Sequence, residues 1–150
     1  MTVTNPTAII DAVTSDILAN SGLTPTTVFK YAEPVVILPA ACPLLTVWCE
    51  QTDFQILTPN PAAYERRHQI EVAWYVASPL MADTAGSGDP TTVHQLDATA
   101  ETLEARIVTY TNGVPGFASQ LIGTLQARRL EPQAGTIWRA LLTFTAEEAS

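Results

Sequence analysis

Histidine is the side chain best suited to acid–base catalysis near neutral pH, and this chain has two, His68 and His94. Neither stands in an HExxH motif or beside a cysteine, so neither has a recognisable metal-binding context. A catalytic pair would require folding to bring the two together, and nothing in their spacing favours that. A small enzyme that uses His68 or His94 is therefore kept only as an alternative hypothesis, which replacing both with Gln would test.

Other patterns that could carry chemistry are weak. The chain has no GxSxG motif of the serine hydrolases, and "GSGDPTT" has too few glycines and no lysine for a phosphate-binding loop. Glu101 and Glu104 lie one turn apart on a predicted helix, on a solvated face rather than in a cleft. Cys42 and Cys49 have no second pair at zinc spacing and are expected to be buried free thiols. The sequence thus predicts no catalytic, cofactor-binding or metal site.

The balance of charge points away from nucleic-acid recognition. The 150 residues carry 15 acids against seven bases, a net charge of −8, and an acidic surface repels phosphate backbones. Such a surface still suits a protein that surrounds DNA without binding it. Only 15% of the residues are charged, against about 25% in a typical soluble domain, so more of the surface is neutral or apolar. We interpret this as a hint of subunit contacts.

Membrane insertion and export are not expected. The first residues lack the basic segment of a signal peptide. The longest apolar run, 34–49, is 16 residues long and is interrupted by prolines, which is too short for a membrane span. The expected location is therefore the cytoplasm in which the chain is made.

Periodicity and capping residues predict helices and strands in the order α-β-β-β-α-β-β. The first helix spans 5–22, with Asn5 as its N-cap, and the second spans 89–113, with Asp89 as its cap and Pro90 at its start. Strands are predicted at 26–34, 44–50, 64–77, 124–132 and 136–148. Segment 53–58 is either a short extension or a loop. Three prolines forbid a central strand at 34–43, and 78–92 is expected to be a long mobile loop.

These elements predict one α+β domain over residues 1–150: a mainly antiparallel sheet of four or five strands, with two amphipathic helices on one face. The long strand has Ile70, Val72 and Trp74 on one face, and Glu71 and Tyr75 on the other. The last strand is apolar on both faces. Two helices cannot cover both sides, so the second face needs another cover. That cover is a neighbouring subunit or, alternatively, the proline-rich segment 34–43 folded back as a lid.

Two arginine doublets stand on predicted strands of this acidic chain, Arg66 with Arg67 and Arg128 with Arg129. Because neighbours in a strand point in opposite directions, each doublet offers one arginine to each side of the sheet. One arginine could pair with an acid inside the subunit while the other reaches a partner. A solvated strand edge guarded by charge is the alternative.

This layout resembles the tail terminator proteins of long-tailed bacteriophages. The resemblance lies in the opening helix "AIIDAVTSDILA", the long strand "RRHQIEVAWYVA", the helix "VHQLDATAETLEARIVTYT" and the closing hairpin "TLQARRLEPQAGTIWRALLTFTAEE". It covers most of the chain, but it is a likeness of element order without a diagnostic motif. Head-closure and tail completion proteins of the phage neck have similar sizes and are alternatives.

The resemblance implies a structural virion protein at the tail–neck junction, without enzymatic activity or cofactor. In that family a hexameric ring caps the tail tube, ends its polymerisation and meets the head-side connector or stopper protein, and DNA passes through the channel. The partners would be other copies of the chain, the major tail tube protein and the connector. A monomeric module that binds an extended peptide at an open sheet edge is a further alternative. Interface candidates are Arg67, Glu71, Tyr75, Asp83, Asp89 and Arg128.

Overall fold

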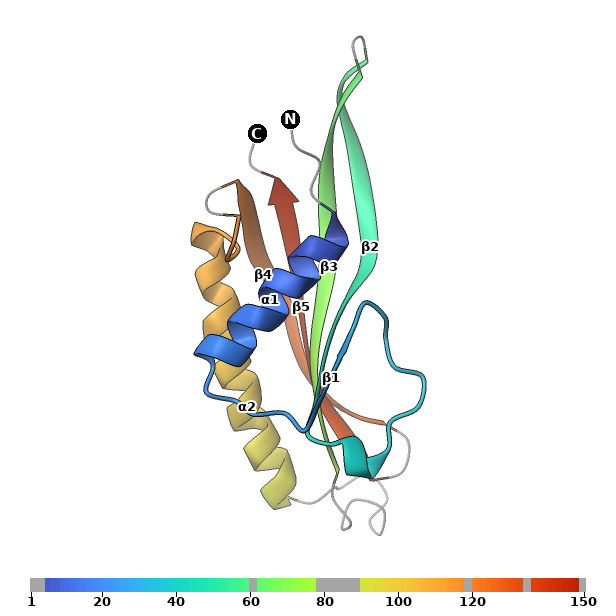
Figure 1. Ribbon diagram of the computed structural model, residues 1–150, viewed down its shortest axis with the longest axis vertical. Coiled ribbons are helices and arrows are strands. Elements are labelled where there is room, and N and C mark those ends of the chain that lie inside the picture. The colour runs from blue at the N-terminus through green and yellow to red at the C-terminus, as the bar shows by residue number, and fades with distance from the viewer. Residues whose placement is uncertain (1–4, 60–61, 78–89, 118–119, 134–135, 149–150) are drawn as a thin grey trace.

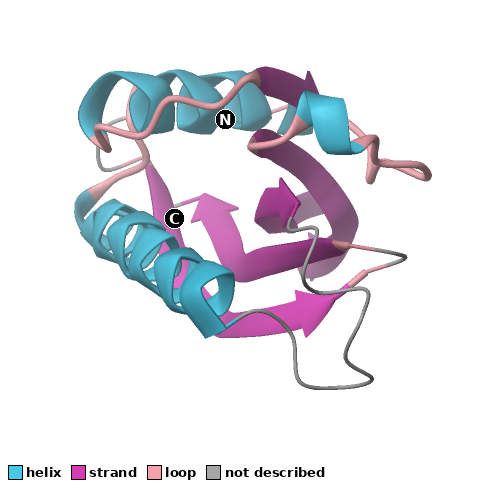
Figure 2. Cartoon of the chain, turned by 90° about the horizontal axis from the view of Figure 1, so that it is seen from below, coloured by secondary structure: helices cyan, strands magenta, loops and turns pink. Residues whose placement is uncertain are grey.

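The computed structural model describes residues 5–59, 62–77, 90–117, 120–133 and 136–148. They form a single α+β domain of two helices and a five-stranded, mostly antiparallel sheet, in the predicted order α-β-β-β-α-β-β. The strands lie side by side in the order β1-β2-β3-β5-β4. Both helices lie on the same side of the sheet, as predicted (Figures 1 and 2). The predicted fold class is therefore confirmed.

Helix α1 (Pro6–Asn20) starts and stops where its capping residues predict. The side chain of Asn5 accepts a hydrogen bond from the Thr7 amide at 2.9 Å, and Pro6 takes the first helical position, where no amide is needed. Gly22 follows the helix with a φ of 76°, which glycine adopts without strain. Thr14 is a buried polar residue of this helix, and its hydroxyl donates to the Ile10 carbonyl at 2.7 Å.

Helix α2 (Pro90–Val108) starts at Pro90, as predicted, and a 3-10 turn, η3 (Thr109–Asn112), continues it to Gly113. Its apolar stripe packs against β4 and β5, which confirms the predicted amphipathic helix on the sheet. The fully or almost fully buried residues of the stripe are Leu96, Ala100, Leu103, Ile107 and Tyr110.

The strands differ from the sequence prediction mainly at their ends. β1 (Thr27–Lys30) is shorter than predicted and pairs in parallel with β2; it stops at Tyr31, whose φ is 82°. β2 (Leu44–Pro59) continues through segment 53–58, with a bulge at Glu50 between its paired residues. The remaining strands are β3 (Ala62–Ala77), β4 (Leu121–Pro132) and β5 (Ile137–Glu148).

The outer part of the β2–β3 hairpin projects beyond the rest of the sheet. β5 pairs with β3 only over Arg67–Ala77, and β1 pairs with β2 only over Leu44–Val47. Residues 53–59 and 62–66 therefore form a ribbon of two strands, here called the arm, which Figure 1 shows extending past the other strands. An arm this thin has no core of its own.

The sheet is apolar on both faces, as predicted. The inner cluster lies between the sheet and the helices, and includes Ile70, Val72 and Trp74. An outer cluster lies on the opposite face and comprises Leu44, Trp48, Ala73, Tyr75, Ile137 and Leu141. Ile37 and Cys42 of the proline-rich segment pack against this outer cluster, so the chain covers it with its own loop. The alternative of a folded-back lid is therefore correct here, and the expectation of an open second face is wrong.

Candidate functional site

Three of the predicted interface residues, Arg67, Glu71 and Tyr75, share the outer face of β3, as strand alternation predicts. Two of them are not available to a partner, because Glu71 is 6% exposed and Tyr75 is 1% exposed in the single chain. Glu71 accepts hydrogen bonds from the Thr143 hydroxyl at 2.6 Å and from the Gln69 amide at 3.1 Å. The expectation that these two side chains present a contact surface is thus wrong, since their bonding groups are used within the subunit.

Arg139 holds the proline-rich loop to the outer face. Its guanidinium donates to Glu131 at 2.6 Å and to the Tyr75 hydroxyl at 3.1 Å, and it also pairs with Glu33 of the loop at 3.5 Å. Burial raises the pKa of Tyr75, although the hydrogen bond from Arg139 opposes the shift. Tyr75 is therefore a neutral acceptor for Arg139 at neutral pH. This network is structural, and it fixes where the loop crosses the sheet.

The arginine doublets divide between the two faces, as predicted. Arg67 pairs with Glu147 on the neighbouring strand. Arg128 lies on the helix side, where it pairs with Asp97 and with Glu104, the latter at 3.3 Å. The choice of Arg128 as a partner-facing residue is not supported by this geometry, because both of its acidic partners belong to α2 of the same chain.

Arg129 is the member of its doublet that sequence reasoning left out. It pairs with Leu141 in the β4–β5 register, which places it on the outer face, and its side chain is exposed. Among the described residues it has no ion-pair partner. Arg129 follows Arg128 in the strand and therefore points to the other face of the sheet. This alternation is the signal that could have identified it.

The two remaining interface candidates, Asp83 and Asp89, lie outside the described residues, as does most of the predicted mobile loop 78–92. Only the last three positions of that loop fall inside a described element, because α2 begins at Pro90. The structure therefore leaves the proposed role of this loop as a prediction.

Exposed apolar side chains gather in two places that sequence reasoning missed. The first is the arm, where Phe54 is 61% exposed and Ile56 is 72% exposed. The second, here called the loop patch, consists of Val35, Val36 and Leu38, which are 98%, 75% and 63% exposed. Contiguous exposed apolar residues usually mark an interaction surface in a soluble protein. These two groups are the candidate functional surfaces of the chain.

The two groups face opposite sides of the sheet. Phe54 pairs with Arg66 across the arm, and Arg66 lies two positions from His68 of the buried inner face, so Phe54 and Ile56 continue that inner face. The Arg66 guanidinium lies 5.4 Å from the centre of the Phe54 ring, on the same side. In the loop, Ile37 points to the outer cluster while its neighbours Val36 and Leu38 are exposed. The loop patch therefore lies beyond the outer face.

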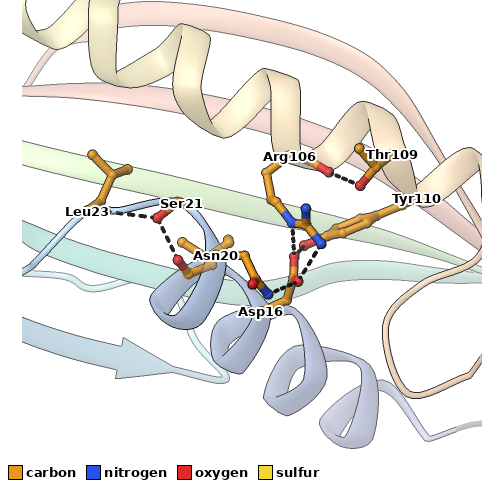
Figure 3. A network of polar contacts seen from close by, with 8 residues as sticks. Asp16, Asn20, Ser21, Leu23, Arg106, Thr109 and Tyr110 are labelled. Atoms are coloured by element: carbon orange, nitrogen blue, oxygen red, sulfur yellow. Dashed lines mark hydrogen bonds and ion pairs between the residues drawn. The ribbon is translucent and has the colours of Figure 1, made fainter.

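The strongest buried polar network is structural. Asp16 of α1, 5% exposed, accepts hydrogen bonds from Arg106 at 2.7 and 2.8 Å, from the Tyr110 hydroxyl at 2.7 Å and from Asn20 at 2.9 Å (Figure 3). Burial would raise the pKa of Asp16, but these donors outweigh it and lower the pKa. Burial and the nearby Asp16 carboxylate raise the pKa of Tyr110. This network joins the two helices.

The structure describes both histidines and both cysteines. His68 is buried in the sheet with its Nδ1 2.9 Å from the Thr52 hydroxyl, whereas His94 is exposed near the start of α2. Cys42 and Cys49 are partly buried free thiols, and burial raises the pKa of Cys42, which disfavours a reactive thiolate. Within the described ranges, no group of His, Cys, Asp or Glu is placed to hold a metal ion.

In the described part of the chain, neither helix is both long and apolar enough to cross a membrane. Comparison with known proteins finds no matching family model and no curated protein of similar sequence. The geometry of the chain itself is therefore the basis for assigning a function.

Proposed function

We propose that this chain is a structural protein of a bacteriophage tail: a terminator that forms a ring on the end of the tail tube, stops its growth and connects it to the head. It acts by assembly, without enzymatic activity or cofactor. The observation that carries the proposal is the projecting arm, on which Phe54 is 61% exposed and Ile56 is 72% exposed. The order of the elements resembles that of tail terminators, and this resemblance is the reason for assigning the assembly to a phage tail.

The position of the exposed apolar side chains supports association between copies of the chain. An arm with exposed Phe and Ile is stabilised when a partner covers it, because burying each such side chain contributes about 1.5–3 kcal/mol. In the proposed ring every subunit would offer the arm and the loop patch to its neighbours. Acidic charge, −8 in total, suits a ring around DNA, since the channel must let DNA pass without retaining it.

A peptide-binding module is a second candidate function, and one observation favours it. β4 is the last strand of the sheet, and among the described residues no strand pairs with its outer edge. An extended peptide could add to this edge by backbone hydrogen bonds. If the chain is instead a head-closure or tail completion protein, the same apolar surfaces would contact a different partner.

Native mass determination and negative-stain imaging of one concentrated sample test the proposal, with and without added tail-tube protein of the same phage. We expect closed rings with an open centre, in solution or seated on one end of each tube. A chain that stays monomeric and does not bind tube ends would overturn the proposal. Binding of extended peptides by that monomer would then support the peptide-binding module.

A further inference from the structure

Asn112 stands directly before Gly113 at the point where α2 and its continuation η3 end. Gly113 has a φ of 130°, which other residues adopt only with strain, so the fold requires a glycine at this position. Asn112 is exposed, and among the residues that the structure describes no hydrogen bond holds its side chain. The fold therefore keeps an unrestrained asparagine side chain next to an obligatory glycine.

We propose that Asn112 is a site of spontaneous deamidation. Asparagine is a thermolabile residue, because the main-chain nitrogen that follows it can attack its side-chain carbonyl carbon. A Cβ atom on the following residue hinders this attack, and glycine has none. Asn20 differs on both counts, since it precedes Ser21 and its Nδ2 donates to Asp16 Oδ1 at 2.9 Å (Figure 3). The inference is independent of the proposed function.

The reaction needs water and no other reactant. The Gly113 nitrogen loses its proton to solvent base and forms a bond with Asn112 Cγ, while the bond from Cγ to Nδ2 breaks and Nδ2 leaves as ammonia. Water then opens the succinimide ring that results. Addition at Cγ leaves aspartate, whereas addition at the main-chain carbonyl carbon leaves isoaspartate, in which the backbone runs through the side chain. No atom is oxidised or reduced.

One hydrogen bond opposes the reaction in the folded chain. The Gly113 amide donates to the Tyr110 carbonyl at 3.0 Å, so its nitrogen becomes reactive only when this bond opens. The bond is the last one of η3, and the ends of helices open at little cost in free energy. The side chain of Tyr110 can stay buried meanwhile, so the core need not open. Folding is therefore expected to slow the reaction without suppressing it.

Both products change the junction between η3 and β4. Aspartate at position 112 adds a negative charge to a chain of net charge −8, at a helix C-terminus, where the dipole disfavours anions. Isoaspartate also lengthens the backbone just before Val114, whose amide donates to the Leu121 carbonyl of β4 at 2.8 Å. The modification thus acts on the contact that leads the chain from the second helix into the sheet.

Incubation of the folded protein at neutral and at mildly alkaline pH tests the inference, with samples digested by trypsin at intervals. Residues 107–128 form one tryptic peptide, in which Asn112 is the only asparagine. Mass spectrometry detects the replacement of its amide by a carboxylate, and chromatography separates aspartate from isoaspartate. The Asn112→Gln variant is the matched control, because it keeps an amide whose attack would have to close a larger ring. A urea-unfolded sample gives the rate without the fold.

We expect Asn112 to convert roughly tenfold faster or more than Asn20 in the same folded sample, because only Asn112 precedes a glycine. The conversion should yield both products and accelerate as the pH rises, and the control peptide should stay unchanged. A peptide 107–128 that stays unmodified in the folded protein while the unfolded sample converts would overturn the inference. Conversion of Asn20 at an equal rate would also overturn it, since the geometry at Asn112 would then have no effect.

Discussion

At the scale of single residues, the Asp16 carboxylate is the polar group on which the helix packing depends most. Its side chain is 3% exposed and receives two hydrogen bonds from Arg106. Replacing Asp16 with Asn leaves the Arg106 charge without its partner, so we expect a loss of about 3 kcal/mol in the free energy of unfolding. Chemical denaturation measures it. Asp11→Asn is the matched control: the Asp11–Lys30 pair is largely exposed to solvent, so its loss should cost far less.

The same carboxylate makes stability depend on pH. The pKa of Asp16 is lowered in the folded chain from its ordinary value of 3.8, so the folded state binds fewer protons than the unfolded state in this range. The stabilisation is therefore complete above about pH 4 and is lost as the pH falls through the lowered folded-state pKa. Urea unfolding at several pH values should show the wild type and Asp16→Asn converging in acid. Free energies of unfolding that change with pH in parallel for the wild type and Asp16→Asn would contradict this role.

Side-chain alternation predicted the faces of β3 correctly, but not what lies over them. Arg67, Glu71 and Tyr75 do share one face, because that follows from strand geometry alone. Arg67 stays half exposed, whereas Tyr75 is buried and accepts a hydrogen bond from Arg139 of another strand, which also pairs with Glu33 of a loop. A pattern within one strand contains no information about such partners. The same reason explains why Arg128 was chosen in place of Arg129.

At the scale of elements, the sequence predicted all the helices and strands but not the length of β2. Segment 53–58 has Asp53 and Gln55 between apolar residues, and its strand exists because β3 pairs with it along the arm. Pairing of that kind is tertiary and is not visible in a local window. The predicted strand 124–132 starts too late for a similar reason, since β4 begins at Leu121 and Gly123 pairs with Ala146.

Gly123 is also where β4 meets the end of the second helix most closely. A Cβ atom built at this position would lie 2.9 Å from Tyr110 Cβ and 3.3 Å from the Phe144 ring. Tyr110 is fully buried, so it has little room to move away. We expect Gly123→Ala to lower the free energy of unfolding by about 1–3 kcal/mol, as overpacking does. An unchanged thermal unfolding temperature would show that η3 shifts without cost.

The arm gives a prediction about assembly rather than stability. Phe54 and Ile56 are exposed, so replacing both with Asp should leave the unfolding temperature of the monomer nearly unchanged. The same change should abolish self-association, because it puts charge on the apolar face of the arm. Sedimentation and native mass report the assembly state, and Gln126→Asp is the control at an exposed position of β4. Association that survives the double change would show that the arm is not at the interface.

At the scale of the whole molecule, the chain folds as a domain that covers its own second sheet face yet leaves apolar side chains on projections. The sequence predicted that both faces are apolar, and the composition hinted at subunit contacts. It could not locate the exposed apolar side chains, because they lie on the proline-rich loop and on the arm, and exposure there depends on how the whole chain packs. The loop was considered as a lid; that it also exposes Val35 and Val36 follows only from the structure.

The most direct measurement is the length of tail tubes grown with and without this protein. Purified tail-tube protein of the same phage is polymerised, the chain is added at fixed times, and tube lengths are measured by negative-stain imaging. The proposed function predicts that elongation stops on addition and that a ring occupies one end of each tube. The Phe54→Asp, Ile56→Asp double variant, added in parallel, should leave growth unaffected. Tubes that keep growing in the presence of the folded wild-type protein would contradict the assignment as a tail terminator.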